Sequence, residues 1–202
     1  MKLYYSPGAC SLSTNIALRE AGLAFVPVMA STKTHQLEDG TDYYTINPLG
    51  YVPMLELDDG ARLREVQVVL QYIADLSPLK NLAPANGTLP RYRLQEWMSF
   101  TSSELHKNFS PLFNPSVPEE AKKVFRDKLL NRFGFLDGEL AGKEYITGSN
   151  FSIADCYLFA VTRWAKGMNV DLSPFANVQA WFDRVSARPA VQEAMRAEDL
   201  IK

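Results

Sequence analysis

The sequence predicts a two-domain protein, in which an α/β domain of element order β-α-β-α-β-β-α precedes an all-helical domain. Three observations lead to this fold class. Short apolar runs alternate with amphipathic stretches over the first 80 residues, a loop with prolines and a glycine follows, and no strand pattern occurs beyond it. We therefore expect an α/β domain over residues 1–80, a linker over 81–89 and a helical domain over 90–202.

Each element of the α/β domain has its own signal. Aromatic and β-branched runs predict the strands, apolar residues at helical spacing predict the helices, and Gly or Pro stands at the breaks. Asp59-Gly60 between two short runs predicts a hairpin, and Pro53, which has no amide hydrogen, is expected to open its first strand. In order, we expect a strand at 3–5, a helix at 11–21, a strand at 25–28, a short helix near 43–46, strands at 51–57 and 61–63, and a helix at 66–76.

The second half of the chain predicts helices only. Ser152 and Asp155 have N-cap and N3 spacing, which predicts a capping box at the start of a helix over residues 153–164. That helix is apolar nearly all round, so we expect it to be the buried centre of its domain. The other helices are expected over residues 90–105, 118–142, 178–185 and 191–195.

The composition narrows the classes of function. The 202 residues carry a formal net charge of −2 without a basic patch, which argues against nucleic acid as a partner. No apolar run reaches the ~18 residues of a membrane span and no signal-peptide pattern occurs, so we expect no membrane partner. The two cysteines, Cys10 and Cys156, suit a reducing compartment better than a disulfide framework, which predicts a cytoplasmic protein.

Cys10 lies where the first strand gives way to the first helix. Free amides and the positive end of a helix dipole stabilise a thiolate at such a position, so we expect a reactive thiol. The motif is Cys10-Ser11-Leu12-Ser13, in which serine stands where a dithiol oxidoreductase has its second cysteine. A mixed disulfide at Cys10 would therefore need an external thiol to release it. Cys156, on the apolar helix, is expected to be an inert core residue.

Two further stretches of the first domain have both a structural and a functional interpretation. Val52-Pro53 is either an ordinary trans bond at a strand start or a cis bond that turns the Val52 amide and carbonyl towards the Cys10 loop, to pair with a bound peptide. Glu65 and Val66 open a helix. Glu65 is either a carboxylate favourable to the helix dipole or, with the first helix amides, a site for a ligand's amino and carboxylate groups.

His106 is one of only two histidines in the chain. Together with Ser99 and Ser103 it forms a polar stripe at helical spacing, on the face away from the apolar residues. Such a stripe either faces water or faces the first domain, and in the second case His106 would be aimed at the thiol. The two histidines and Cys10 have no standard metal-ligand spacing, so no metal site is expected.

These residues together resemble a glutathione transferase, most closely of the bacterial beta class. The resemblance spans the whole chain. The Cys10 loop and Glu104-Leu105-His106-Lys107 are specific to that class, whereas the Ser152 to Asp155 motif is general to the superfamily. The other matching stretches are residues 47–53, 63–65, 71–75 and 111–113.

The resemblance implies a thioredoxin-like domain packed on a helical domain in a homodimer, with glutathione as co-substrate and no other cofactor. The implied activity is conjugation of glutathione to small hydrophobic electrophiles, with thiol–disulfide exchange at Cys10 as a further reaction. Cys10 and His106 would be catalytic, and Pro53 would follow a cis bond. The implied glutathione contacts are Ala9, Cys10, His35, Val52, Pro53, Glu65, Val66, Ser99, Ser103, Glu104 and His106, and the co-substrate would lie beside Phe109, Phe113 and Trp164.

Three positions depart from the class pattern. Val66 replaces a small or hydroxylated residue, His35 stands where lysine is frequent, and Ser99 stands where asparagine is frequent. Val66 loses a hydroxyl contact, His35 makes the charge near the glycyl carboxylate pH-dependent, and Ser99 has a shorter reach, so we expect glutathione affinity below that typical of the class. Two alternatives stay open at this point: a non-catalytic glutathione-binding protein that sequesters apolar ligands, and a glutathione-dependent reductive dehalogenase that uses the same cysteine.

Overall fold

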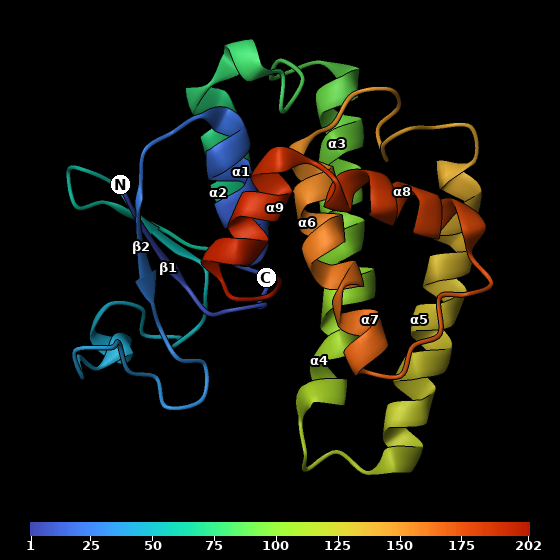
Figure 1. The fold of residues 1–202 in the computed structure, drawn as a ribbon, viewed down its shortest axis with the longest axis horizontal. Helices are drawn as coiled ribbons and strands as arrows, with labels where there is room; N and C mark the ends of the chain where they lie inside the picture. The colour runs from blue at the N-terminus through green and yellow to red at the C-terminus, as the bar shows by residue number, and fades with distance from the viewer. The chain divides into compact units, whose positions relative to one another are not determined.

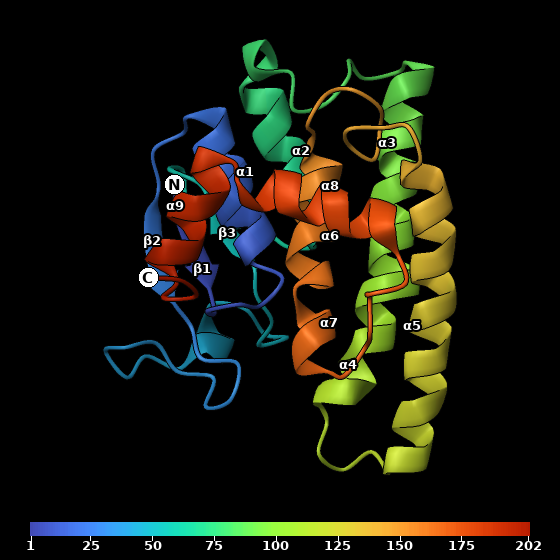
Figure 2. The same ribbon diagram turned by 45° about the vertical axis from the view of Figure 1, so that its right-hand side comes forward.

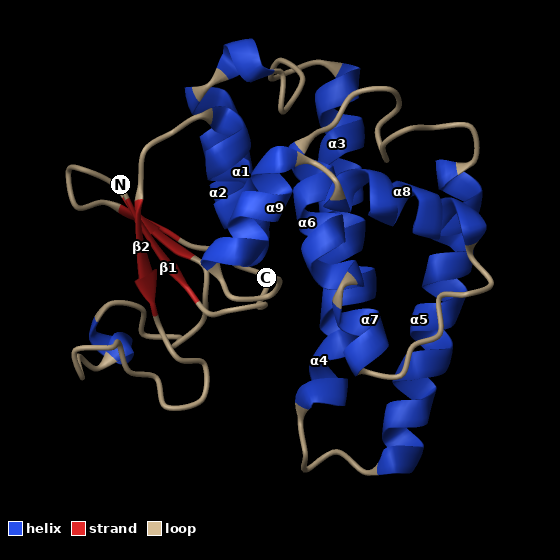
Figure 3. Ribbon diagram, in the orientation of Figure 1, coloured by secondary structure: helices blue, strands red, loops and turns tan.

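The computed structural model describes residues 1–202 as two compact units. Unit 1 comprises Met1–Ala83 and Arg188–Lys202, and unit 2 comprises Pro84–Ala187. All the β-strands belong to unit 1, whereas the regular elements of unit 2 are helices (Figure 3). The predicted fold class is therefore confirmed. None of the helices is both long and apolar enough to cross a membrane.

Unit 1 is built on a mixed four-stranded sheet of order β2-β1-β3-β4. β1 runs parallel to β2 (Figure 1) and antiparallel to β3, and β3 pairs antiparallel with β4. The order of elements along the chain agrees with the predicted one, and β3 begins directly after Pro53 as expected. The elements are β1 (Lys2–Tyr5), α1 (Leu12–Ala21), β2 (Val26–Met29), η1 (Tyr43–Thr45), β3 (Met54–Glu56), β4 (Arg62–Leu63), α2 (Val66–Leu76) and η2 (Pro78–Lys80).

The two faces of this sheet carry different layers, because successive strand residues point to opposite sides. Leu3 and its cross-strand partner Leu55 are fully buried on one face. α1 contacts β1 and packs on α2. On the other face Tyr4 and Met54 pack with Tyr43 of η1. The sheet is therefore packed on both faces, and this packing holds in place the strands and the loops that follow them.

The last helix, α9 (Pro189–Ala197), packs against α1 in unit 1 (Figure 2). Arg188 makes a two-pronged ion pair with Glu20 at 2.7 and 2.9 Å. The sequence pattern had grouped residues 188–202 with the helical domain; in the structure they complete unit 1. An amphipathic helix shows from sequence which of its faces is apolar, but not which surface will cover that face.

Unit 2 contains one uninterrupted helical rod, formed by α3 (Leu89–Phe100), the π-helical segment η3 (Thr101–His106) and α4 (Lys107–Phe113). α5 (Glu119–Leu140) packs beside this rod. The sequence predicted regular helix over 90–105, and the π segment was not anticipated. Widened turns of this kind are frequent at functional sites, because they re-aim the side chains that follow.

The centre of unit 2 is α6 (Ile153–Thr162), in which every residue is buried as predicted. The expected capping box is confirmed: the Asp155 carboxylate accepts hydrogen bonds from the amide (3.0 Å) and hydroxyl (2.9 Å) of Ser152. The same carboxylate accepts from the Ile146 amide and from Trp181 Nε1, each at 2.9 Å. One side chain therefore ties α6 to the preceding loop and to α8 (Ala176–Ser186); α7 (Trp164–Gly167) follows α6.

Replacing Asp155 by Ala is expected to lower the free energy of unfolding by about 3 kcal/mol or more, because it leaves several buried donors without an acceptor. Urea denaturation followed by tryptophan fluorescence measures this change. Asp183→Ala, at an exposed position of α8, is the matched control and should change stability by less than about 0.5 kcal/mol. A loss below about 1 kcal/mol for Asp155→Ala would contradict the anchoring role.

Candidate functional site

The residues expected at the site form two sets, one in each compact unit. The set in unit 1 surrounds Cys10, and the set in unit 2 surrounds His106. Unit 1 contains Ala9, Cys10, His35, Val52, Pro53, Glu65 and Val66, and unit 2 contains Ser99, Ser103, Glu104, His106, Phe109, Phe113 and Trp164.

Short-range hydrogen bonds shape the loop that carries Cys10 between β1 and α1. The hydroxyl of Ser11 accepts from the Ser6 amide (3.1 Å) and donates to the Ser6 carbonyl (3.3 Å). The Ala9 amide donates to the same carbonyl at 3.0 Å, and Ser13 Oγ donates to the Cys10 carbonyl at 2.6 Å. The serines of the motif therefore close the loop and present Cys10 at the first turn of α1.

The Cys10 thiol is buried, with 8% of the residue exposed, and Sγ donates a hydrogen bond to the Val52 carbonyl at 3.3 Å. Burial raises the pKa of this thiol to about 12, although the backbone amides of Cys10 and Ser11 act in the opposite direction. The expectation of a stabilised thiolate is therefore wrong for the chain without ligand. The amides at the helix end do stabilise the thiolate, but the free energy needed to bury an unpaired charge is larger than this stabilisation.

The Val52–Pro53 peptide bond is cis, as the resemblance implies. Both residues are buried, and the Val52 carbonyl already accepts the hydrogen bond from Cys10. A carbonyl oxygen has two lone pairs, so this one can accept a second donor from a ligand backbone.

Glu65 directly precedes α2 with φ 66° and ψ 114°, outside the regions that residues with a side chain usually adopt. Its carbonyl accepts hydrogen bonds from the Val68 and Val69 amides, each at 2.9 Å, while its side chain is exposed. Backbone strain of this kind is concentrated at binding sites. Val66 opens α2 with a buried side chain, so a ligand would meet its backbone rather than its methyl groups.

His35 also has a positive φ, 53°, and its ring lies 4.7 Å from that of Tyr44 between centroids. Gly50 makes this arrangement possible. A Cβ on Gly50 would lie 2.7 Å from His35 Nδ1 and 2.7 Å from Tyr44 Cε1, and its φ is 66°. Nδ1 of His35 is buried without a hydrogen-bond partner in the protein, so the ring has unused polar capacity.

Glu198 is a structural part of the Cys10 loop that the sequence analysis missed. The residue is 2% exposed, and its carboxylate accepts hydrogen bonds from the Gly8 amide and from Asn15 Nδ2, each at 3.0 Å. Asn15 Oδ1 in turn accepts from Arg19 Nε at 2.9 Å. Glu198 therefore connects, by hydrogen bonds, the loop before Cys10 with the helix that follows it. A lone glutamate after the last helix carries no local signal for this role.

In unit 2, His106 is the last residue of the π segment. Its Nδ1 lies 2.8 Å from the hydroxyl of Tyr157 on α6, and its ring meets the Trp164 ring edge-on at 4.9 Å between centroids. Burial lowers the pKa of His106 to about 4, and the charge of Lys107 adds to this shift. His106 is therefore a neutral imidazole at neutral pH. Tyr157 was not among the predicted site residues, although a tyrosine on a fully buried helix requires a partner for its hydroxyl.

The remaining polar residues of unit 2 lie along the same rod. Ser99 and Ser103 are exposed, and Ser103 Oγ donates to the Ser99 carbonyl at 3.0 Å. Glu104 is bound by Arg132 at 2.6 Å, and this hydrogen bond holds the pKa of Glu104 below its ordinary value. His106 departs from this exposed stripe because most of its ring is covered.

Three aromatic residues meet at Trp164. Phe109 and Phe113 both contact it edge-on, at 5.7 and 5.3 Å between ring centroids. Phe109 is fully buried and also packs on Phe133, whereas Phe113 is 48% exposed. Phe113 is therefore the member of this group that is accessible at the surface, whereas Phe109 packs against Trp164 from the core. No group of three or more His, Cys, Asp or Glu side chains is arranged to hold a metal ion.

Comparison with known proteins agrees with this architecture. The family model of the glutathione S-transferase N-terminal domain matches residues 8–76, and that of the C-terminal domain matches residues 100–189. Glutathione S-transferase GstA of Escherichia coli O157:H7 is 42% identical over 200 residues, which cover 99% of this chain and all of the relative.

Two solved structures are similar over 100% of both chains. A bacterial beta-class glutathione S-transferase from Sphingomonas chungbukensis is 47% identical with a TM-score of 0.96, and a sphingomonad glutathione S-transferase complexed with glutathione is 44% identical with a TM-score of 0.95. The chain belongs to the glutathione S-transferase family. It is a glutathione transferase, and the resemblance to the bacterial beta class is confirmed.

The raised pKa predicts how Cys10 reacts in the absence of glutathione. Alkylation by iodoacetamide is expected to accelerate about tenfold per pH unit between pH 7 and 9 without levelling off, because the thiolate is a small fraction throughout. Intact mass spectrometry measures the rate, and Cys10→Ala should remove the labelling, since Cys156 is fully buried. A plateau below pH 8 would contradict the dominance of burial over the helix end.

Proposed function

We propose that this glutathione transferase conjugates glutathione to small hydrophobic electrophiles, and that Cys10 adds a thiol–disulfide exchange activity. One observation carries the proposal: the Cys10 thiol at the start of α1 donates to the carbonyl of Val52, beside the cis bond to Pro53. The Cys10 thiol and the buried backbone of Val52 are thereby brought together. Such a backbone segment pairs with an extended peptide, and glutathione is a short peptide whose central residue carries a thiol.

The proposed glutathione contacts in unit 1 follow from the chemistry of each group. The Val52 backbone pairs with the cysteinyl residue, with Ala9 and Pro53 beside it. The Glu65 carboxylate binds the γ-glutamyl amino group, and the Val66 amide at the start of α2 binds the adjoining carboxylate. His35 serves the glycyl carboxylate. In unit 2, Ser99, Ser103 and Glu104 are proposed as outer polar contacts.

In the conjugation reaction the glutathione thiol gives its proton to water, and the resulting sulfur anion attacks an electrophilic carbon. A carbon–sulfur bond forms, and the leaving group departs with the electron pair of the broken bond. When its S–H turns from the Val52 carbonyl to the bound ligand, the protonated Cys10 thiol stabilises the sulfur anion as a hydrogen-bond donor. His106 acts as the second group at that sulfur. Phe113 and Trp164 provide the apolar surface for the electrophile.

In the exchange reaction Cys10 itself is the nucleophile. Its thiolate attacks the glutathione sulfur of a mixed disulfide between glutathione and another thiol, the sulfur–sulfur bond breaks, and the other thiol leaves as a thiolate that takes up a proton. A second glutathione thiolate then attacks the disulfide between Cys10 and glutathione, which restores Cys10 and releases glutathione disulfide. No cysteine stands at the Ser13 position to resolve the mixed disulfide within the chain.

Replacing Cys10 by Ala separates the two reactions. We expect exchange to fall about 100-fold or more, because the nucleophile is lost, and conjugation to fall about tenfold or less, because only one hydrogen-bond donor is lost. Activity with an aromatic electrophile and with a glutathione mixed disulfide measures the two rates. Intact mass spectrometry after incubation with glutathione disulfide should show one glutathionyl group on the wild type and none on the variant. Equal loss of both activities, or no adduct on the wild type, contradicts the proposal.

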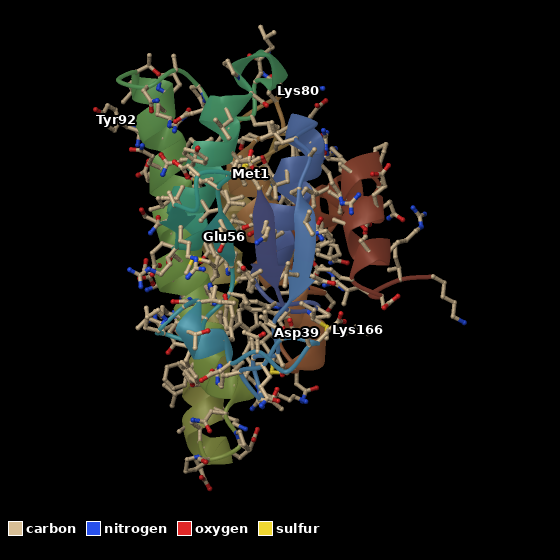
Figure 4. All side chains as sticks on the ribbon, turned by 90° about the vertical axis from the view of Figure 1, so that its left-hand side faces the viewer. Met1, Asp39, Glu56, Lys80, Tyr92 and Lys166 are labelled. Atoms are coloured by element: carbon tan, nitrogen blue, oxygen red, sulfur yellow. The ribbon has the colours of Figure 1, made fainter.

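We also propose that the protein is a homodimer that uses a groove on unit 2. The groove is lined by a mutually packed aromatic group, Trp97, Phe100 and Phe135, and Phe135 is 52% exposed. Tyr92, 59% exposed, projects from α3 (Figure 4). The rim carries both signs of charge, from Arg93, Glu96, Glu139 and Lys143. An exposed aromatic patch with a mixed-charge rim is typical of a surface that pairs with a second copy.

Placing a charge in this groove tests the homodimer. Phe135→Glu is expected to convert the dimer to monomers in light scattering coupled to size-exclusion chromatography, because an unpaired carboxylate would be buried at the contact. Val124→Glu, at a 65% exposed position elsewhere on α5, is the matched control and should stay dimeric. A wild-type monomer, or a dimeric Phe135→Glu variant, contradicts this assignment.

A further inference from the structure

The two nitrogens of the His106 ring have different surroundings. Nδ1 lies 2.8 Å from the Tyr157 hydroxyl, and Tyr157 is buried with 2% exposed. Nε2 makes no hydrogen bond within the protein and is not among the buried unpartnered atoms. The ring is therefore attached to the core through one nitrogen, and the other nitrogen is the one available to a ligand.

The partner of Nδ1 is held rigidly. Tyr157 belongs to α6, whose first turn is anchored by Asp155 through Ser152, Ile146 and Trp181. Trp164 meets the His106 ring from a further direction, with an interplanar angle of 68°. The tyrosine hydroxyl therefore offers a fixed hydrogen-bonding point to an imidazole whose own rotation is restricted.

The neutral ring carries one hydrogen, and its partner decides on which nitrogen the hydrogen lies. A phenol is a stronger acid than a neutral imidazole N–H, and an imidazole nitrogen is a stronger base than a phenol oxygen. The favoured arrangement is therefore donation from the Tyr157 hydroxyl to Nδ1, which leaves the hydrogen on Nε2. The low pKa of His106 agrees with this arrangement, since a second ring proton is absent at neutral pH.

We propose that Tyr157 is a positioning residue that holds His106 in the Nε2–H tautomer, so that His106 acts as a hydrogen-bond donor and not as a general base. This inference rests on the proposed function in one respect, that His106 serves the glutathione sulfur. In conjugation the glutathione thiol releases its proton to water, and a neutral N–H donor stabilises the resulting sulfur anion without taking up that proton. The opposite tautomer would present a lone pair at Nε2 and could only accept a proton there.

The first arm of the test reads the tautomer directly and needs no activity. In protein labelled with ¹⁵N-histidine, two-bond proton–nitrogen correlations identify which ring nitrogen carries the hydrogen. We expect His106 to show the Nε2–H pattern in the wild type and a mixture of tautomers in Tyr157→Phe. His35 is the only other histidine and serves as an internal control whose signals should not move. An Nδ1–H pattern in the wild type, or an unchanged pattern in Tyr157→Phe, overturns the proposal.

The second arm is a double-mutant cycle on conjugation. Tyr157→Phe keeps the ring that meets His106 edge-on at 5.9 Å, so a purely packing role predicts unchanged turnover. We expect kcat to fall about three- to tenfold with little change in KM for glutathione, as for the loss of one transition-state hydrogen bond. In a His106→Ala background the same change should have no further effect. Additive losses overturn the coupling.

The two arms distinguish this inference from the proposed function. If His106→Ala retains full conjugation, His106 has no role at the sulfur, and the proposed function is wrong at that residue while the tautomer measurement still decides the role of Tyr157. Urea denaturation of each variant identifies any that has lost its fold. If His106→Ala does not fold, His106→Gln, which keeps an N–H donor, is measured in its place. Partial rescue by His106→Gln favours the donor role, and loss equal to that of a folded His106→Ala contradicts it.

Discussion

A buried carboxylate at the end of the chain holds the loop that carries the functional thiol. Burying a charge is unfavourable unless hydrogen bonds replace the lost water, and Glu198 receives them from the Gly8 amide and the Asn15 side chain. Because these donors flank Cys10, the shape of the loop depends on residues 188–202, which belong to unit 1. The two segments of unit 1 are thus separated along the chain by the whole of unit 2.

Burial sets the chemical state of both central residues. It raises the pKa of Cys10 and lowers that of His106, and in each case the neutral form is favoured because the charged form loses its hydration. The helix-end amides oppose the shift in the pKa of Cys10 without outweighing it, and Lys107 adds to the shift in the pKa of His106. A protonated thiol and a neutral imidazole are both hydrogen-bond donors, which suits the stabilisation of an anion brought by the substrate more than the generation of one by the protein.

The sequence predicted the elements well where the signal is local. Asp59-Gly60 marked the hairpin, Pro53 marked the start of β3, and Ser152 with Asp155 marked the start of α6. Tertiary contacts decided the rest. The π segment before His106 has an ordinary helical sequence, and α9 has an apolar face whose partner is set by packing on α1. Phe109 and Phe113 have the same side chain, yet one is core and the other is exposed.

The amino-acid sequence by itself determined the element order, the position of Cys10 at a helix start, the absence of a second cysteine in its motif and the family. These depend on residue type and spacing, which the sequence contains in full. Only the tertiary structure decided that Cys10 is buried against Val52, that Glu198 secures its loop, and that Tyr157 meets Nδ1 of His106. Those contacts join residues 42, 190 and 51 positions apart, and burial and partner choice at such separations follow from packing of the whole unit.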